Sequence, residues 1–194
     1  MRLELDELRR RLARRRPPQF SVYGDDGAGR ERTTAAAVLI PMIAHPGELT
    51  VLFTQRTQHL KSHSGQVSFP GGRVEPGDAS VEFAALREAK EEIGLAAEGV
   101  EILGRLPDYH TRTGFRVAPV IGLVTPPLEL EPDPREVAAV FEVPLAFLLD
   151  ERNRERRTRE FQGKTLGFYV YEYHGHVIWG ATAGMLVNLH RMLE

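Results

Sequence analysis

The chain has 194 residues, of which 42% are hydrophobic and 27% are charged, and it carries a formal net charge of −2 without any cysteine. This length and composition predict one globular domain spanning residues 1–194 and argue against intrinsic disorder. The missing cysteines exclude a disulfide framework, a thiolate zinc site and a cysteine nucleophile, and the balanced charge indicates no nucleic-acid partner.

The N-terminal segment is charged and lacks the apolar stretch of a secretory signal. Residues 3–16 place leucines near helical spacing among charged residues, which predicts an amphipathic helix, and residues 24–32 form a polar, glycine-rich loop. We treat residues 1–33 as an N-terminal extension of the domain. The most apolar run, residues 35–44, is about half as long as a membrane-spanning helix. We therefore expect a cytoplasmic protein with no membrane partner, either monomer or homodimer.

The remaining elements alternate between strands and helices without a regular rhythm. We expect little regular structure over residues 56–78 and a helix over residues 79–93 that ends at Gly94. The other expected elements are strands at 34–43, 50–55, near 100–106 and 115–124, a proline-rich loop at 126–134, a short helix at 144–149, two short strands within 157–173 and a final helix at 180–193. This pattern predicts an α/β fold, with a mixed sheet covered by helices.

The helix over residues 79–93 concentrates carboxylates. Glu88, Glu91 and Glu92 stand at i, i+3 and i+4, so at about 100° per residue their side chains share an arc of about 100°. Three like charges repel one another, and the macrodipole disfavours anions toward the C-terminal end of a helix. A hard divalent cation that prefers oxygen ligands, Mg²⁺ or Mn²⁺, would resolve this repulsion.

Two other interpretations of this helix stay open at this point. Surface helices are rich in glutamate, so these residues could form a solvated acidic face. Arg87 stands four residues before Glu91 and could form an ordinary helical ion pair with it. The preceding turn, Phe69-Pro70-Gly71-Gly72, favours a site, because glycine lets backbone carbonyls approach a metal or a phosphate closely.

Residues 71–95 resemble the Nudix box, G-x5-E-x7-R-E-U-x-E-E-x-G-U, in which U is aliphatic. The first glycine is matched by Gly72, and the second half of the box by Arg87, Glu88, Glu91, Glu92, Gly94 and Leu95. Three departures occur: Asp78 replaces the first glutamate, eight residues instead of seven separate Asp78 from Arg87, and Ala89 replaces a larger aliphatic residue.

Residues 52–72 resemble a signature that precedes the box in the coenzyme A pyrophosphatases of the Nudix superfamily, L-L-T-x-R-S-x3-R-x3-G-x3-F-P-G-G. The matching residues are Leu52, Thr54, Arg56, Gly65, Phe69, Pro70, Gly71 and Gly72, and the conservative replacements are Phe53, Thr57 and Lys61. The extra residue inside the box is also similar to this subgroup's pattern. The segment Trp179-Gly180-Ala181-Thr182-Ala183 looks like a further, looser family match.

The resemblance implies the Nudix α/β/α sandwich, with a mixed sheet between helices, and metal-dependent hydrolysis of coenzyme A to 3′,5′-ADP and 4′-phosphopantetheine. It implies Glu88 and Glu92 as the principal ligands of Mg²⁺ or Mn²⁺, and the Gly72 carbonyl as a further ligand. Glu91 would complete the metal site or help to activate water. Arg87 would hold the loop by pairing with a carboxylate, and structural roles would fall to Gly71 and Gly94.

Four residues outside the box helix are candidates for contact with the substrate. Arg56 and Lys61 would bind phosphate, since coenzyme A carries a 3′-phosphate besides its diphosphate. His63 could hydrogen-bond the substrate, and Glu136 is a candidate general base. The alternatives are a surface or scaffold role for Arg56 and Lys61, a solvent-exposed histidine for His63, and a helix-start residue for Glu136. The run of arginines and glutamates over residues 151–160 indicates a solvated face.

Three alternatives to coenzyme A hydrolysis belong to the same superfamily. The box alone does not exclude hydrolysis of ADP-ribose, a dinucleotide or a nucleoside triphosphate, although the upstream signature argues against it. A nucleotide-sensing module without catalysis would be expected to lose box glutamates, and all three are present. An isomerase acting on isopentenyl diphosphate is expected to need a cysteine, which this chain lacks.

Overall fold

The structure is a computed structural model that describes residues 4–13, 33–59, 63–161 and 163–194. The helices are α1 (Leu5–Ala13), α2 (Val81–Ile93), α3 (Leu145–Leu148) and α4 (Gly180–Leu193), with 3₁₀ turns η1 (Ala97–Gly99) and η2 (Glu151–Asn153). The strands are β1 (Thr34–His45), β2 (Glu48–Arg56), β3 (Val67–Ser68), β4 (Gly71–Arg73), β5 (Val100–Arg105), β6 (Tyr109–His110), β7 (Phe115–Val124), β8 (Val137–Pro144), β9 (Arg154–Phe161), β10 (Lys164–Tyr173) and β11 (His176–Trp179).

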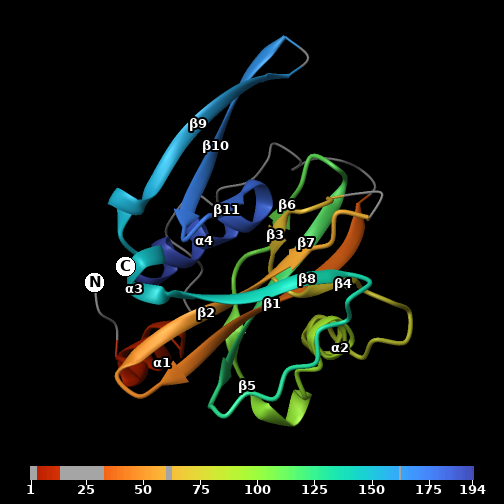
Figure 1. Ribbon diagram of the computed structural model, residues 1–194, viewed down its shortest axis with the longest axis vertical. Helices are drawn as coiled ribbons and strands as arrows, with labels where there is room; N and C mark the ends of the chain where they lie inside the picture. The colour runs from red at the N-terminus through yellow and green to blue at the C-terminus, as the bar shows by residue number, and fades with distance from the viewer. Residues whose placement is uncertain (1–3, 14–32, 60–62, 162) are drawn as a thin grey trace.

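An eight-stranded sheet forms the centre of the fold (Figure 1). Strand β1 runs parallel to β7, whereas its pairings with β2 and β4 are antiparallel, so the sheet is mixed. Residues 42–45 of β1 pair with residues 48–51 of β2, and beyond this point the two strands diverge. Strand β4 then pairs with β1, and β3 pairs with β2. The segment from β3 to β4 therefore enters a fork between two central strands.

Helix α2 covers one face of this sheet. The buried side chains of Ala84, Ala85 and Ala89 are small, so the helix packs closely on the strands beneath it. Ser80 caps the N-terminus by accepting a hydrogen bond from the Phe83 N–H at 3.1 Å. Gly94 ends the helix with a left-handed φ of 71°. These signals fix the helix at residues 81–93.

The opposite face of the sheet is covered by α1 and α4. Ile40 and Met42 of β1 belong to the core on this side, whereas Leu39 and Ile43 belong to the core under α2. This alternation follows from the two-residue period of a strand. The molecule is thus a mixed sheet between helices, and the predicted α/β/α sandwich is confirmed.

A second sheet has the order β11-β10-β9 and packs against α4. Strands β9 and β10 form a long hairpin that extends away from the sandwich (Figure 1). The sequence predicted two short strands in this region, and the structure shows two longer ones.

Most predicted elements are confirmed with bounds that shift by at most two residues: the strands at 34–43, 50–55, 100–106 and 115–124 and the helices at 79–93, 144–149 and 180–193. The expectation of little regular structure over residues 56–78 was wrong at β3 and β4, which are too short to show a period. Strand β8 was missed because most of it is only partly buried and lacks a clear alternation. Strand β11 was missed because it has four residues.

The predicted N-terminal helix over residues 3–16 corresponds to α1 (Leu5–Ala13). Its residues 3 and 14–16, and the loop predicted at 24–32, lie outside the described residues. Among the described helices, none has the length and apolar character needed to cross a membrane.

Candidate active site

The two glycines of the box occupy the fork between β1 and β2. Gly71 pairs with Val38 and Gly72 with Ala37. A Cβ atom on Gly71 would lie 2.4 Å from the Ala37 carbonyl oxygen, so this position requires glycine. The backbone of β4 therefore lies directly beside the central strand and in contact with helix α2.

Glu88 projects from α2 onto Gly72. A Cβ atom on Gly72 would lie 2.5 Å from Oε1 of Glu88, so the missing side chain makes the space that the carboxylate occupies. Burial raises the pKa of Glu88, and a hydrogen bond from Arg87 opposes that rise. The carboxylate and the backbone of β4 thus lie in direct contact.

Glu92 lies one turn further along α2, with a side chain only 7% exposed. Oε2 of Glu92 accepts a hydrogen bond from the Gly71 N–H at 3.4 Å, and Oε1 lies 3.5 Å from Nη1 of Arg56. Desolvation raises the pKa of Glu92 to about 7, against the opposing attraction of Arg56. A buried carboxylate with this pKa is held in its charged form at a cost.

Glu136 reaches the same group of carboxylates from a distant part of the sequence. The loop before it is tied to the end of α2, because the N–H groups of Glu131 and Asp133 donate to the carbonyls of Ile93 and Glu92, both at 2.9 Å. Oε2 of Glu136 lies 3.8 Å from Nη2 of Arg56. The negative charge of Glu136 contributes to the raised pKa values of Glu88 and Glu92.

Arg87 connects the box helix to the loop before it. Its guanidinium makes a bidentate pair with Asp78 at 3.0 and 3.1 Å and donates to the Arg73 carbonyl at 3.1 Å. The Asp78 side chain is 1% exposed, and its hydrogen bonds from Arg87 lower its pKa. Asp78, at the position of the box's first glutamate, therefore serves as the partner of Arg87 in this structure.

Glu91 has a more exposed position than the other two box glutamates. Its side chain is 59% exposed and lies 3.2 Å from Arg87, the helical ion pair that the sequence left open. Arg87 also contacts Glu88 at 3.0 Å, whereas Glu92 faces Arg56. The three box carboxylates share one side of α2, where Arg87 pairs with Glu88 and Glu91 and Arg56 faces Glu92.

The donor set around Gly72 fits a hard divalent cation. All the side-chain donors are carboxylate oxygens, the ligand type that Mg²⁺ and Mn²⁺ prefer. Besides burial, repulsion from Glu136 raises the pKa of both Glu88 and Glu92, and a dication would relieve this repulsion. Gly72 also leaves the Glu88 carboxylate close to the backbone of β4.

A cavity of about 620 Å³ lies in front of β4. Its wall includes Gly71, Gly72 and Arg56. These residues contact the carboxylates of α2, which therefore lie next to the cavity. The described lining contains four arginines and no acidic residue: Arg56, Arg73, Arg112 and Arg159. Its aromatic residues are Phe69, Phe115, Phe168 and Trp179. Such a cavity favours a ligand with several phosphates and a planar ring.

The upstream candidates have separate positions. Arg56 and His63 both line the cavity, and Nδ1 of the exposed His63 is 2.7 Å from Oε1 of Gln66. Arg56 also faces Glu92 and Glu136, and its buried Nε has no hydrogen-bond partner among the described residues. Lys61 lies outside the described residues.

Sequence reasoning missed part of the cavity wall. Arg159 belongs to the run that was interpreted as a solvated face; it is exposed, and it also lines the cavity. In the sequence, Trp179 has no signal beyond its place in the loose family match over residues 179–183. Alternation along residues 154–161 was a usable signal, since it separates Arg159 from Arg156 on opposite strand faces.

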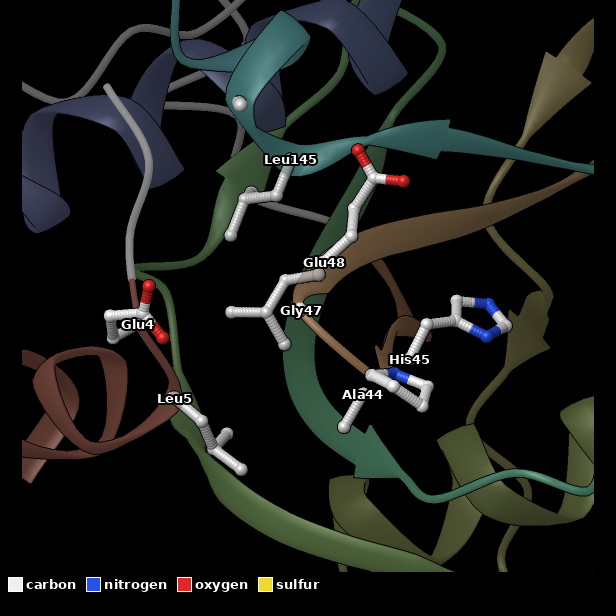
Figure 2. Close-up of a pocket in the computed structure, with 10 residues that line it drawn as sticks. Glu4, Leu5, Ala44, His45, Gly47, Glu48 and Leu145 are labelled. Carbon is white, nitrogen blue, oxygen red and sulfur yellow. The ribbon is translucent and has the colours of Figure 1, made fainter.

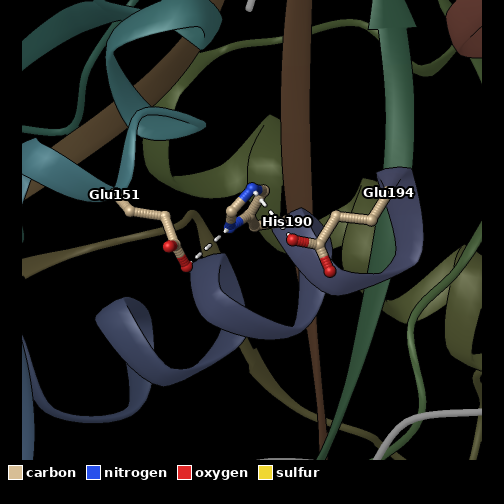
Figure 3. A group of neighbouring side chains, drawn as sticks. All are labelled: Glu151, His190 and Glu194. Carbon is tan, nitrogen blue, oxygen red and sulfur yellow. Dashed lines mark ion pairs between the residues drawn. The ribbon is translucent and has the colours of Figure 1, made fainter.

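A second acidic group lies near the C-terminal end of α4. Figure 3 shows Glu151 and Glu194 on either side of His190, at 3.9 and 3.6 Å from its ring nitrogens. Among the described residues, this is the one group of three whose ligand atoms all lie within 4.8 Å of one another. Arg154 pairs with Glu151 and contacts Nδ1 of His190 at 3.4 Å. The guanidinium of Arg154 therefore already supplies a positive charge to this group.

A smaller cavity of about 390 Å³ lies at the turn between β1 and β2 (Figure 2). Its lining includes Leu5 of α1, Leu145 of α3 and the turn residues His45, Gly47 and Glu48. None of the box residues belongs to the described lining of this cavity. The site assembled around the fork is therefore separate from it.

The fold and the site together define a class: an α/β/α protein with a group of carboxylates that fits a divalent cation, beside an arginine-lined cavity. The model of the NUDIX domain matches residues 33–162. The chain belongs to the Nudix hydrolase family, whose members generally use divalent metal ions.

Relatives cover most of the chain. One, from Photorhabdus laumondii, is named "Uncharacterized Nudix hydrolase NudL" and is 40% identical over 159 residues, covering 82% of this chain and 84% of the relative. A protein of the same name from Shigella boydii is 43% identical over 154 residues, covering 79% and 80%.

Solved structures also resemble this fold. The Nudix hydrolase RenU from M. smegmatis is 26% identical with a TM-score of 0.50, covering 58% of this chain and 71% of that chain. A MutT/nudix family protein from Enterococcus faecalis is 17% identical with a TM-score of 0.51, covering 98% and 70%. The second likeness concerns the fold alone.

Proposed function

We propose that this protein hydrolyses the diphosphate of coenzyme A, or of a coenzyme A derivative, with Mg²⁺ or Mn²⁺ as cofactor. The observation that carries the proposal is the arginine-lined cavity beside the carboxylates of α2. Coenzyme A carries three phosphate groups, two in the diphosphate and one on the ribose, and the cavity supplies several guanidinium groups to pair with them. The upstream signature over residues 52–72 points to the same substrate.

The box residues would hold the cation at the diphosphate. Glu88 and Glu92 are the proposed principal ligands, with Glu91 and the Gly72 carbonyl completing the site. When bound, the cation neutralises charge on the diphosphate and makes water more acidic. Arg87 keeps Glu88 in position by holding the loop around Asp78. Gly71 keeps the backbone of β4 against β1, and Gly94 lets the loop that carries Glu136 pass the end of α2.

Hydrolysis needs one proton transfer that the protein's own groups can assist. Water attacks one phosphorus of the diphosphate, the bridging P–O bond breaks, and two phosphomonoesters leave. Glu136 is the proposed general base that accepts the proton of the attacking water. Arg56 faces both Glu136 and Glu92, so it can place a positive charge next to the reacting phosphoryl group. His63, and Lys61 upstream of it, are proposed phosphate contacts.

The test is a substrate panel. Purified protein is incubated with coenzyme A, ADP-ribose, diadenosine polyphosphates and nucleoside triphosphates, with Mg²⁺, with Mn²⁺ and with chelator, and products are separated by chromatography. We expect metal-dependent release of 3′,5′-ADP and 4′-phosphopantetheine from coenzyme A as the fastest reaction. If coenzyme A stays intact while ADP-ribose or a dinucleotide is cleaved, the substrate assignment is wrong and the broader Nudix activity holds. If no substrate is cleaved but one binds, the protein is a nucleotide-sensing module.

A further inference from the structure

One wall of the large cavity comes from the hairpin of β9 and β10. In the register of this pair, Leu166 lies opposite Arg159, and Phe168 lies opposite Arg157. Directly opposed residues share a face of the sheet, so Arg159, Leu166 and Phe168 lie on the same face. All three line the cavity.

The hairpin wall continues into an aromatic corner. Trp179, at the end of β11, lines the same cavity and meets Phe168 edge to face, with ring centroids 6.2 Å apart. Both rings are half-buried, so each keeps part of its surface open. A corner of two rings favours the stacking of a planar heterocycle such as a nucleobase.

Arg159 stands next to this corner. It is the diagonal neighbour of Phe168 across the strand pair, a separation of about 7–8 Å that long side chains span. Two of the other three cavity arginines have different surroundings: Arg56 faces Glu92 and Glu136, and Arg73 lies over the ring of Phe115 at 5.8 Å. A guanidinium beside an aromatic corner fits a phosphate carried on the sugar next to a stacked base.

We propose that Phe168, Trp179 and Arg159 form the subsite for the adenosine end of the substrate. The adenine ring lies against Phe168 and Trp179, and the ribose 3′-phosphate pairs with Arg159. This inference rests on the proposed hydrolysis of coenzyme A, because it places the diphosphate at Gly71 and Gly72 and the adenosine toward the hairpin. The pantetheine arm carries neither a ring nor a charge, so the hairpin wall does not suit it.

The test compares coenzyme A with 3′-dephospho-coenzyme A, which differ only in the phosphate that Arg159 would read. We expect Arg159→Ala to lower kcat/KM for coenzyme A by about tenfold or more, as for a lost charge-assisted hydrogen bond. The value for 3′-dephospho-coenzyme A should stay within about twofold. Compared with Arg159→Ala, Arg159→Lys should restore part of the preference for coenzyme A over 3′-dephospho-coenzyme A. Trp179→Leu should lower kcat/KM for both substrates alike, since both carry the adenine.

Arg156→Ala is the matched control. Arg156 lies on the same strand but on the opposite face, where its guanidinium packs over Gly167. Its replacement should leave kcat/KM unchanged for both substrates. Equal losses for both substrates in Arg159→Ala, or no loss for either, would overturn the assignment of the 3′-phosphate.

A binding measurement separates this inference from the proposed function. Titration calorimetry with adenosine 3′,5′-bisphosphate and with 5′-AMP needs no turnover. Wild-type protein should prefer the bisphosphate, and Arg159→Ala should remove that preference. If wild-type protein does not cleave coenzyme A, the proposed function fails, while this preference still decides the subsite: its presence supports the subsite and its absence refutes it.

Discussion

Two groups of acidic residues in this molecule each include a contact with an arginine, and they differ in burial. Beside Arg56, Glu92 is 7% exposed and its pKa is raised to about 7. In the second group, Glu151 pairs with Arg154 and Glu194 lies beside the ring of His190; the side chains of Glu151 and Glu194 are 65% and 62% exposed. The second group brings its ligand atoms closer together, yet only the first adjoins a large cavity. We therefore take desolvation beside a cavity, rather than close spacing of carboxylates, as the criterion for the proposed reactive group.

The largest effect should follow from neutralising Glu92. We expect Glu92→Gln to lower kcat by about a thousandfold, because a bound cation contributes several kcal/mol of transition-state stabilisation. The matched control is Glu194→Gln in the exposed group, which should leave kcat unchanged. Circular dichroism should show both variants folded. Wild-type turnover in Glu92→Gln would overturn the comparison.

The space left by Gly72 gives the next largest effect. Gly72→Ala would place a Cβ atom 2.5 Å from the Glu88 carboxylate, so this side chain must move. A displaced ligand should cost about 10–100-fold in metal affinity or activity. Gly77→Ala, in the loop that follows β4, has no atom within 4 Å of the added carbon and should behave as wild type. Equal activity of the two variants, measured with the fastest substrate of the panel, would contradict the contact between Gly72 and Glu88.

The free energy of unfolding should also fall as pH rises, because the buried Glu92 then becomes charged. Its pKa rises from an ordinary 4.5 to about 7, so the folded protein holds a proton that the unfolded chain has already lost within this window. The free energy of unfolding therefore falls as pH increases from 4.5 to about 7, by about 3 kcal/mol in total. Thermal unfolding with chelator should show Glu92→Gln level with wild type near pH 4.5 and more stable at pH 8. A difference that is constant with pH would refute this cause.

The smallest effect concerns two bidentate pairs of similar geometry. Arg87 pairs with Asp78, whose side chain is 1% exposed. Arg152 pairs with Asp150, and the Arg152 side chain is 89% exposed. An exposed pair contributes little, because water and salt screen it. Arg87→Ala should therefore lower the melting temperature by several degrees, and Arg152→Ala by about one degree or less. Equal shifts would show that burial does not distinguish the pairs.

The box helix could be predicted from the sequence because its signals are local. The spacing of Glu88, Glu91 and Glu92 and the stop at Gly94 depend only on helical geometry, and the structure places the helix within two residues of the prediction. The pairing of Arg87 with a carboxylate was expected from the resemblance, but its partner Asp78 lies in the loop before the helix and was not identified from the sequence.

The rest of the site depends on pairings between distant strands. Glu136 approaches Arg56 because β8 pairs with β2, and the sequence pattern did not reveal β8. Arg159 lines the cavity together with residues of β3, β4 and α4, which come from distant parts of the chain. Composition alone indicates a charged surface for the β9–β10 hairpin, because it does not show which face of the hairpin adjoins the cavity.

The hydrogen bonds between the end of α2 and the loop before Glu136 determine where extra residues can be inserted into the chain. The carbonyls of Glu92 and Ile93 accept from Asp133 and Glu131, and Gly94 leaves the room for this approach. These hydrogen bonds help to set the distance between Glu92 and Glu136. An insertion between Asp133 and Glu136 would separate them, whereas the proline-rich segment before Glu131 is free to lengthen without altering their distance.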